Sequence, residues 1–132
     1  MATSPTPALP SLPDLPFAGI TDLAAAYRAG SVSPVEVTQA LLDRIARLDG
    51  ALHSYLTVTP ELALAQARAA EAEMQRGQFR GPMHGVPIGI KDLCNTAGVR
   101  TTWGSAILKD NVPAEDATVV RQLYAAGAVM LG

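Results

Sequence analysis

The sequence has very few residues of the kinds that build disulfide frameworks and metal centres. It contains one cysteine and two histidines in 132 residues. A single cysteine excludes an internal disulfide, and these side chains offer too few ligands for a zinc site made of Cys or His. We therefore expect a protein that works without a metal or another cofactor.

An excess of charge of one sign is also missing. Ten Lys and Arg stand against 12 Asp and Glu, which gives a formal net charge of -2. This balance provides no basic surface, so we expect no direct binding of nucleic acid. No apolar run approaches the ~20 residues that span a bilayer, and we expect no membrane association. Residues 1–19 contain no Lys or Arg, which a secretory signal would carry at its start, so the expected location is the cytoplasm.

What the sequence does have is the apolar content of a globular domain, at 48 % of its residues. Its length fits one domain or part of a larger one. Residues 1–19 form a predicted proline-rich tail that wraps a surface or stays mobile, because proline disfavours regular helix. Residues 20–132 form the predicted folded portion. Five of the ten prolines lie in the tail: Pro5, Pro7, Pro10, Pro13 and Pro16.

Two helices are predicted at the start of the folded portion. Thr21 can cap the first helix, and Gly30 stops it. Ser33 can cap the second, because a proline follows it and Glu36 stands where a capping box requires an acidic side chain. Apolar residues then recur at helical spacing as far as Gly50, where we expect the helix to end.

A short strand and a third helix are predicted next. Residues 54–59 are rich in β-branched and aromatic side chains, which is typical of a strand. The third helix starts at Pro60 and runs to about Arg76. Its small residues would let it pack close to a neighbour, whereas Glu73 belongs to a face that we expect to be solvated. The predicted buried face consists of Leu62, Ala65, Ala69 and Ala72.

The last third of the chain predicts a parallel α/β unit. Residues 86–91 form a strand, Asp116 can cap a helix that runs through Ala126, and residues 128–131 begin another strand. This order favours parallel pairing. The predicted fold class is α/β, with N-terminal helices followed by the start of a mixed, mainly parallel sheet covered by helices. A final parallel strand that no helix covers leaves an apolar face open, so we expect further chain, from this polypeptide or another, to complete it after Gly132.

Lys91 is the residue that best fits a chemical role. The chain has eight arginines but only two lysines, and Lys91 ends an apolar strand. Burial lowers the pKa of a lysine, and a neutral amine can act as a general base. The pattern alone leaves a structural alternative open, in which the ammonium reaches solvent or pairs with Asp92 or Asp110.

A longer pattern around Lys91 resembles the amidase signature family. In that family a Gly-Pro-Leu-His-Gly-Ile-Pro-like run leads into a strand that ends in Lys-Asp. Residues 81–92 here read Gly-Pro-Met-His-Gly-Val-Pro-Ile-Gly-Ile-Lys-Asp. The similarity covers about residues 20–132, so it does not rest on one short motif. Further matching segments are residues 31–37, 48–49, 96–99, 101–105, 116–120 and 125–132.

The resemblance implies the amidase signature fold, of which residues 20–132 would be the N-terminal portion. It also implies an enzyme with a Ser–cis-Ser–Lys triad, in which Lys91 is the lysine that moves protons through a bridging serine to a nucleophilic serine. Both serines of the family lie in a downstream Gly-Ser-rich segment, which this sequence lacks, so we expect the 132 residues alone to be inactive. The serines of the chain are Ser4, Ser11, Ser31, Ser33, Ser54 and Ser105.

Three functions stay open at this point. The first is an amidase that hydrolyses a small, non-peptide carboxamide to a carboxylate and ammonia or an amine, with a homodimer as one option for its assembly. The second is the glutamine-hydrolysing subunit of the tRNA-dependent amidotransferase, which releases ammonia from glutamine for its partner subunits. Residues 91–95, Lys-Asp-Leu-Cys-Asn, depart from the Lys-Asp-Asn-Ile expected of that subunit. The third is a truncated, non-catalytic module that binds a partner through the open sheet edge.

Other polar residues around Lys91 have weaker claims to a role. Cys94 is three positions away, as in a Cys–Lys nucleophile pair, but no surrounding motif supports that reading. We interpret His84 as a hydrogen-bonding residue of the loop rather than as a base. The polar segment after the strand is where α/β proteins gather the walls of a pocket. Its candidates for such a wall are Thr101, Thr102, Gly104 and Ser105.

Overall fold

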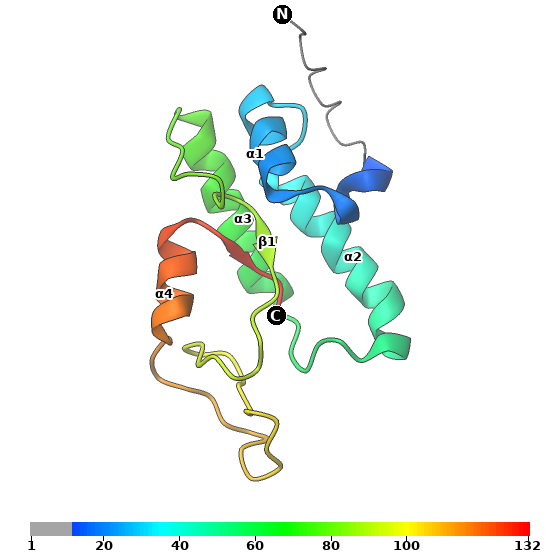
Figure 1. The fold of residues 1–132 in the computed structure, drawn as a ribbon, viewed down its shortest axis with the longest axis vertical. Coiled ribbons are helices and arrows are strands. Elements are labelled where there is room, and N and C mark those ends of the chain that lie inside the picture. The colour runs from blue at the N-terminus through cyan, green and yellow to red at the C-terminus, as the bar shows by residue number, and fades with distance from the viewer. Residues whose placement is uncertain (1–11) are drawn as a thin grey trace, which may run out of the picture.

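The fold of this protein comes from a computed structural model, which describes residues 12–132. Figure 1 shows α1 and α2 on one flank of a central strand pair and α4 on the other, with the loops between β1 and α4 extending away from the helices. The elements in chain order are a 3-10 turn η1 (Leu12–Phe17), α1 (Ile20–Ala29), α2 (Pro34–Leu52), α3 (Pro60–Gln75), β1 (Pro87–Ile88), α4 (Thr118–Ala125) and β2 (Val129–Met130).

The start of α2 follows the predicted capping chemistry. The Ser33 hydroxyl accepts a hydrogen bond from the Glu36 N–H at 3.2 Å, and the Glu36 carboxylate accepts one from the Ser33 N–H at 2.8 Å. Two backbone donors that the first turn leaves free are thereby satisfied. Helix α1 ends at Gly30 as predicted, but its N-cap is Gly19 rather than Thr21.

The predicted end of α2 at Gly50 is wrong, because the helix continues to Leu52. The chain turns at His53, which adopts the left-handed conformation with φ 52°. The Asp49 carboxylate stabilises this later exit by accepting hydrogen bonds from the N–H groups of Ser54 and Tyr55, at 2.6 and 3.2 Å. A glycine inside a helix costs about 1 kcal/mol relative to alanine, which is too little to stop a helix held by such contacts.

The predicted strand over residues 54–59 is also wrong, since this segment forms no regular strand. Only its last residue, Thr59, hydrogen-bonds to the chain around β2. The Thr59 N–H donates to the carbonyl oxygen of Leu131 at 2.9 Å, and the Thr59 hydroxyl donates to that of Met130 at 3.1 Å. The segment therefore covers the outer edge of β2 at one point instead of extending the sheet.

Strands β1 and β2 pair in parallel, which confirms the predicted topology. Pro87 stands opposite Val129, and Ile88 stands opposite Met130. Single backbone bonds extend the pairing beyond the regular part, and the last of them joins the Ile90 N–H to the Gly132 carbonyl at 2.8 Å. The predicted strand over residues 86–91 is thus regular only at 87–88, although its pairing reaches Ile90.

Helix α4 (Thr118–Ala125) begins one residue later than the predicted cap at Asp116 implies. Its N-cap is Ala117, and the carboxylate of Asp116 accepts a hydrogen bond from the Ala97 N–H at 2.7 Å instead of capping the helix. Of the residues predicted to be its apolar face, Val120 is fully buried, but Val119 is 47 % exposed.

The core has two clusters, one formed by η1, α1, the start of α2 and Val86, and the other by α2, α3 and the chain around β2. Small side chains do allow α3 to pack closely, as predicted, but the buried face of the helix is shifted: it consists of Ala63, Ala67 and Ala70. Residues 12–17, which fall in the predicted proline-rich tail, form η1, and Leu15 packs into the core at 2 % exposure. The rest of that tail, residues 1–11, lies outside the described residues. Within residues 12–132, no helix has both the length and the apolarity to cross a bilayer.

Candidate functional site

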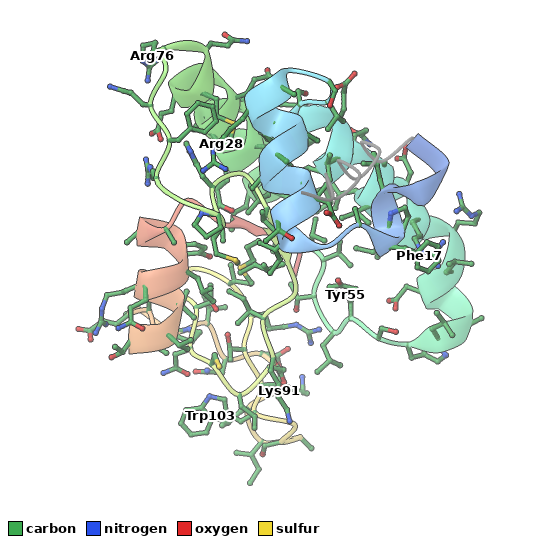
Figure 2. All side chains as sticks on the ribbon, turned by 45° about the horizontal axis from the view of Figure 1, so that its top comes forward. Phe17, Arg28, Tyr55, Arg76, Lys91 and Trp103 are labelled. Atoms are coloured by element: carbon green, nitrogen blue, oxygen red, sulfur yellow. The ribbon has the colours of Figure 1, made fainter. Side chains whose placement is uncertain are left out.

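Lys91 lies just after the paired segment, where the chain leaves the sheet. Figure 2 shows it together with Trp103 in the loop region beyond the strands. Its backbone carbonyl accepts a hydrogen bond from the Cys94 N–H at 2.9 Å. The Lys91 side chain is exposed, which agrees with the alternative in which its ammonium reaches solvent and not with the burial that the base hypothesis assumed. The reason is that, within residues 12–132, β1 pairs with β2 alone and gives way to a loop after Ile88.

Neither of the carboxylates considered as partners of Lys91 pairs with it. The Asp92 carboxylate is bound by a turn farther along the chain, and Asp110 pairs with Lys109. Among residues 12–132, Lys91 takes part in no ion pair. The Lys91 amine therefore has no carboxylate partner among the described residues.

A cavity of about 490 Å³ opens beside Lys91. One wall of it is the segment from Ser54 to Thr57, which includes Tyr55. Gly89 faces this tyrosine, since a Cβ atom on Gly89 would lie 3.3 Å from the Tyr55 hydroxyl. Burial, together with the Asp49 carboxylate, raises the pKa of Tyr55, so this hydroxyl stays neutral. The other lining residues are Gly89, Ile90, Lys91, Asp92, Cys94, Thr96, Val99, Arg100, Thr101, Met130 and Gly132.

The guanidinium of Arg100, which the sequence did not single out, holds this wall in place. It donates to the Leu56 carbonyl and the Thr57 hydroxyl on one side, and to the Lys109 carbonyl on the other. No periodic pattern marks such a residue, because its three acceptors come from distant segments and two of them are backbone oxygens.

Asp92 is the centre of the polar loop. Its carboxylate accepts hydrogen bonds from the Thr102 N–H at 2.8 Å, from the Thr102 hydroxyl and from the Gly104 N–H at 3.2 Å. Burial raises the pKa of Asp92, but these hydrogen bonds outweigh burial and bring the pKa of Asp92 below its ordinary value. Asp92 is therefore a carboxylate at neutral pH.

Of the residues predicted for the pocket wall, the structure places only Thr101 at the cavity. Thr102 and Gly104 face Asp92 instead, and the Ser105 hydroxyl accepts a hydrogen bond from the Ile107 N–H at 3.3 Å. Cys94 lines the cavity as a free, partly buried thiol.

His84 hydrogen-bonds within its loop, as predicted, and lies away from the Lys91 cavity. Its Nδ1 accepts from the Arg80 N–H at 3.3 Å, and its Nε2 lies 3.1 Å from the Glu73 carboxylate without the alignment of a hydrogen bond. Burial lowers the pKa of His84, although the Glu73 charge opposes the shift. Arg80 donates to Glu73 at 2.7 Å, and this hydrogen bond lowers the pKa of Glu73. Glu73 is therefore not the solvated residue that the helical pattern predicts.

Comparison with known proteins defines the class to which this fold and site belong. The family model described as Amidase matches residues 36–132. "Putative amidase AmiD" of Mycobacterium bovis is 51 % identical over 113 residues, which cover 86 % of this chain and 24 % of that protein. A glutamyl-tRNA(Gln) amidotransferase subunit of Methylococcus capsulatus is 52 % identical over 113 residues, which cover 86 % of this chain and 23 % of that protein. The chain belongs to the amidase family.

Solved structures agree with this assignment and with the predicted α/β fold class. The peptide amidase from Stenotrophomonas maltophilia superimposes with a TM-score of 0.82 at 40 % identity, over 89 % of this chain and 25 % of that one. A fatty acid amide hydrolase superimposes with a TM-score of 0.79 at 27 % identity, over 92 % of this chain and 21 % of that one. The chain spans about a quarter of the length of the curated relatives it matches.

Proposed function

We propose that the protein acts in the hydrolysis of a small, non-peptide carboxamide and that Lys91 is the lysine of its Ser–cis-Ser–Lys triad. The observation that carries the proposal is the position of Lys91. It lies just after the paired segment, four residues beyond the Gly-Pro-Met-His-Gly-Val-Pro run, borders a cavity of about 490 Å³ and has no carboxylate partner among the described residues. An amine at the rim of a cavity, with no carboxylate bound to it, can reach a hydroxyl that enters the cavity.

The reaction needs two serines that these residues do not include, so they would come from the remainder of a family-length enzyme. The nucleophilic serine attacks the amide carbon, and its proton passes through the bridging serine to the neutral Nζ of Lys91. The C–N bond then breaks, and the ammonium of Lys91 returns the proton by the same route to the departing nitrogen. Water hydrolyses the acyl-serine ester to the carboxylate, with Lys91 again accepting and returning a proton.

The test is the change Lys91→Ala in a family-length amidase that carries this segment, with Lys109→Ala as the matched control. Lys109 pairs with Asp110 on an exposed loop, so its loss removes a lysine without touching the cavity. We expect Lys91→Ala to lower kcat by at least ~10²-fold, in line with the loss of a positioned base, and Lys109→Ala to leave it unchanged. Near-normal turnover of Lys91→Ala would remove Lys91 from the mechanism.

A second candidate function is that of the glutamine-hydrolysing component of an aminoacyl-tRNA amidotransferase. The identity of 52 % to an amidotransferase subunit, against 51 % to AmiD, is what supports it. The departure at residues 91–95 from Lys-Asp-Asn-Ile supports the stand-alone amidase. Glutaminase activity that appears only when the partner subunits co-purify would decide for the amidotransferase.

A further inference from the structure

The three hydrogen bonds to the Asp92 carboxylate all come from one turn, residues 102–104. Two of the donors are the N–H groups of Thr102 and Gly104, and the third is the Thr102 hydroxyl. A fourth bond runs between the two backbones, from the Trp103 N–H to the Asp92 carbonyl at 2.9 Å. Both the side chain and the main chain of Asp92 are thus fixed by a turn ten residues farther along the chain.

The turn has a left-handed backbone that presents two N–H groups to the Asp92 carboxylate. Trp103 has φ 54°, a left-handed conformation that bulky residues rarely adopt, and Gly104 has φ 68°. A turn of this kind points neighbouring N–H groups toward one side, which makes a concave site for negative charge. The Asp92 carboxylate fills this site, and Thr102 is buried against it at 6 % exposure. Without the carboxylate, the N–H and the hydroxyl proton of Thr102 would have no acceptor among the described residues.

Asp92 is also the neighbour of Lys91 in the chain. A carboxylate in that position would ordinarily be available to an adjacent ammonium, but here both of its oxygens are occupied by the turn. The Cys94 N–H also holds the Lys91 carbonyl, and on the N-terminal side the Ile90 N–H donates to the Gly132 carbonyl. The backbone of Lys91 is therefore fixed from both sides, while its side chain stays free at the cavity.

We propose that Asp92 is the positioning residue of the Lys91 site: by binding the turn at residues 102–104, it fixes the backbone that presents Lys91 to the cavity and leaves the lysine amine without a counter-ion. This proposal rests on the proposed function of Lys91. It assigns Asp92 no contact with substrate and no proton transfer.

The kinetic test uses Asp92 and Thr102 variants of a family-length amidase that carries this segment. We expect Asp92→Asn to lower kcat by about 10–100-fold with little change in KM, because a displaced catalytic group loses the alignment on which its rate depends. Thr102→Ala should cause a smaller loss and Thr102→Ser almost none, because serine keeps the hydroxyl donor. The kcat of the double variant that combines Asp92→Asn with Thr102→Ala should be no lower than that of Asp92→Asn alone. Asp110→Asn, on the exposed loop, is the matched control and should leave kcat unchanged.

A spectroscopic readout separates the turn from the chemistry. Trp103 is the only tryptophan of this sequence, and its indole Nε1–H donates to the Asn95 side chain at 2.9 Å. In enzyme labelled with 5-fluorotryptophan, the ¹⁹F resonance that disappears in Trp103→Phe reports the state of the turn. We expect Asp92→Asn and Thr102→Ala to shift this resonance and Thr102→Ser to keep it.

Three results would overturn the proposal. The first is an unmoved ¹⁹F resonance in Asp92→Asn. The second is a shifted resonance in Asp92→Asn with unchanged kcat. The third is a kcat of the Asp92→Asn, Thr102→Ala double variant that is lowered by the product of the two single losses. If Asp92→Asn does not fold, the comparison of Thr102→Ala with Thr102→Ser decides the question by the same two readouts. Failure of the proposed function is recognised separately, because it would appear as near-normal turnover of the Lys91→Ala variant.

Discussion

A Cβ atom on Gly127 would lie 2.5 Å from Cδ2 of the His84 imidazole. The two residues join parts of the chain that are far apart in the sequence, the loop before β1 and the turn between α4 and β2. The same junction contains a backbone hydrogen bond from the Gly85 N–H to the Gly127 carbonyl at 2.8 Å. Glycine is required at position 127 both by its φ of 83° and by the buried ring beside it.

Replacing Gly127 by alanine should therefore cost more than its backbone conformation alone explains. The matched control is Gly98→Ala, because Gly98 has a similar φ of 72°, but no atom of the described residues outside its immediate neighbours would lie within 4 Å of a Cβ atom there. We expect Gly98→Ala to lower the free energy of unfolding by about 1 kcal/mol and Gly127→Ala by about 1–3 kcal/mol more, owing to overpacking. Urea unfolding followed by circular dichroism measures both. Equal losses of unfolding free energy in the two variants would show that the His84 ring can move aside for the added methyl group at no cost in free energy.

The cap of α2 gives a second prediction. Ser33→Ala removes the hydroxyl that accepts from the Glu36 N–H, and we expect the free energy of unfolding to fall by about 1 kcal/mol. Ser54→Ala is the control, since Ser54 is exposed and contributes only its backbone N–H to the hydrogen bonds of the α2 exit. The same urea titration compares the two variants, and a loss as large in Ser54→Ala would mean that the cap contributes nothing specific.

The buried imidazole predicts a dependence of stability on pH. Burial lowers the pKa of His84 in the folded protein below its ordinary 6.5. At a pH between the folded and the unfolded pKa of His84, the unfolded chain therefore binds a proton that the folded chain does not. Stability from neutral His84 is fully present above pH 6.5 and is lost as the pH falls below it. The charges that face the ring are those of Glu73, which favours protonation, and Arg80, which opposes it.

Unfolding free energies measured from about pH 8 to pH 5 check this sign. The protein should lose stability toward the acid end, and His84→Gln, which cannot titrate, should lose less over the same interval. The pKa of Glu73 is lowered from an ordinary 4.5, so its own loss of charge falls below this range. A wild-type curve that is flat, or that rises toward pH 5, would contradict the prediction.

The parts of the fold that the sequence predicted correctly are set by residues close together in the chain. The capping box of Ser33 and Glu36 spans one helical turn, and the stop at Gly30 depends on one left-handed residue. The strand over residues 54–59 failed for the opposite reason. Its composition favours a strand, but whether it pairs depends on the edge of β2, of which it meets only Leu131 and Met130.

The candidate site divides in the same way. Lys91 could be singled out because it follows an apolar segment and a long run of matching residues. The exposure of its side chain could not be predicted, because it depends on how many strands flank β1. The role of Asp92 could not be predicted either, since its partner Thr102 stands ten residues away with no periodicity linking them. The buried face of α3 was displaced because a helix rich in alanine has no strongly apolar side to mark it.

The parallel pairing of β1 with β2 also fixes an order of events during synthesis on the ribosome. Helices α1 to α3 precede β1 in the chain, so they can begin to form and to pack on one another before β1 and β2 are translated. Pro87 and Ile88 have to wait for Val129 and Met130, which are translated only after the whole intervening loop and α4. The nascent polypeptide therefore carries the Lys91 segment, already translated but still unpaired, while residues 92–128 are added.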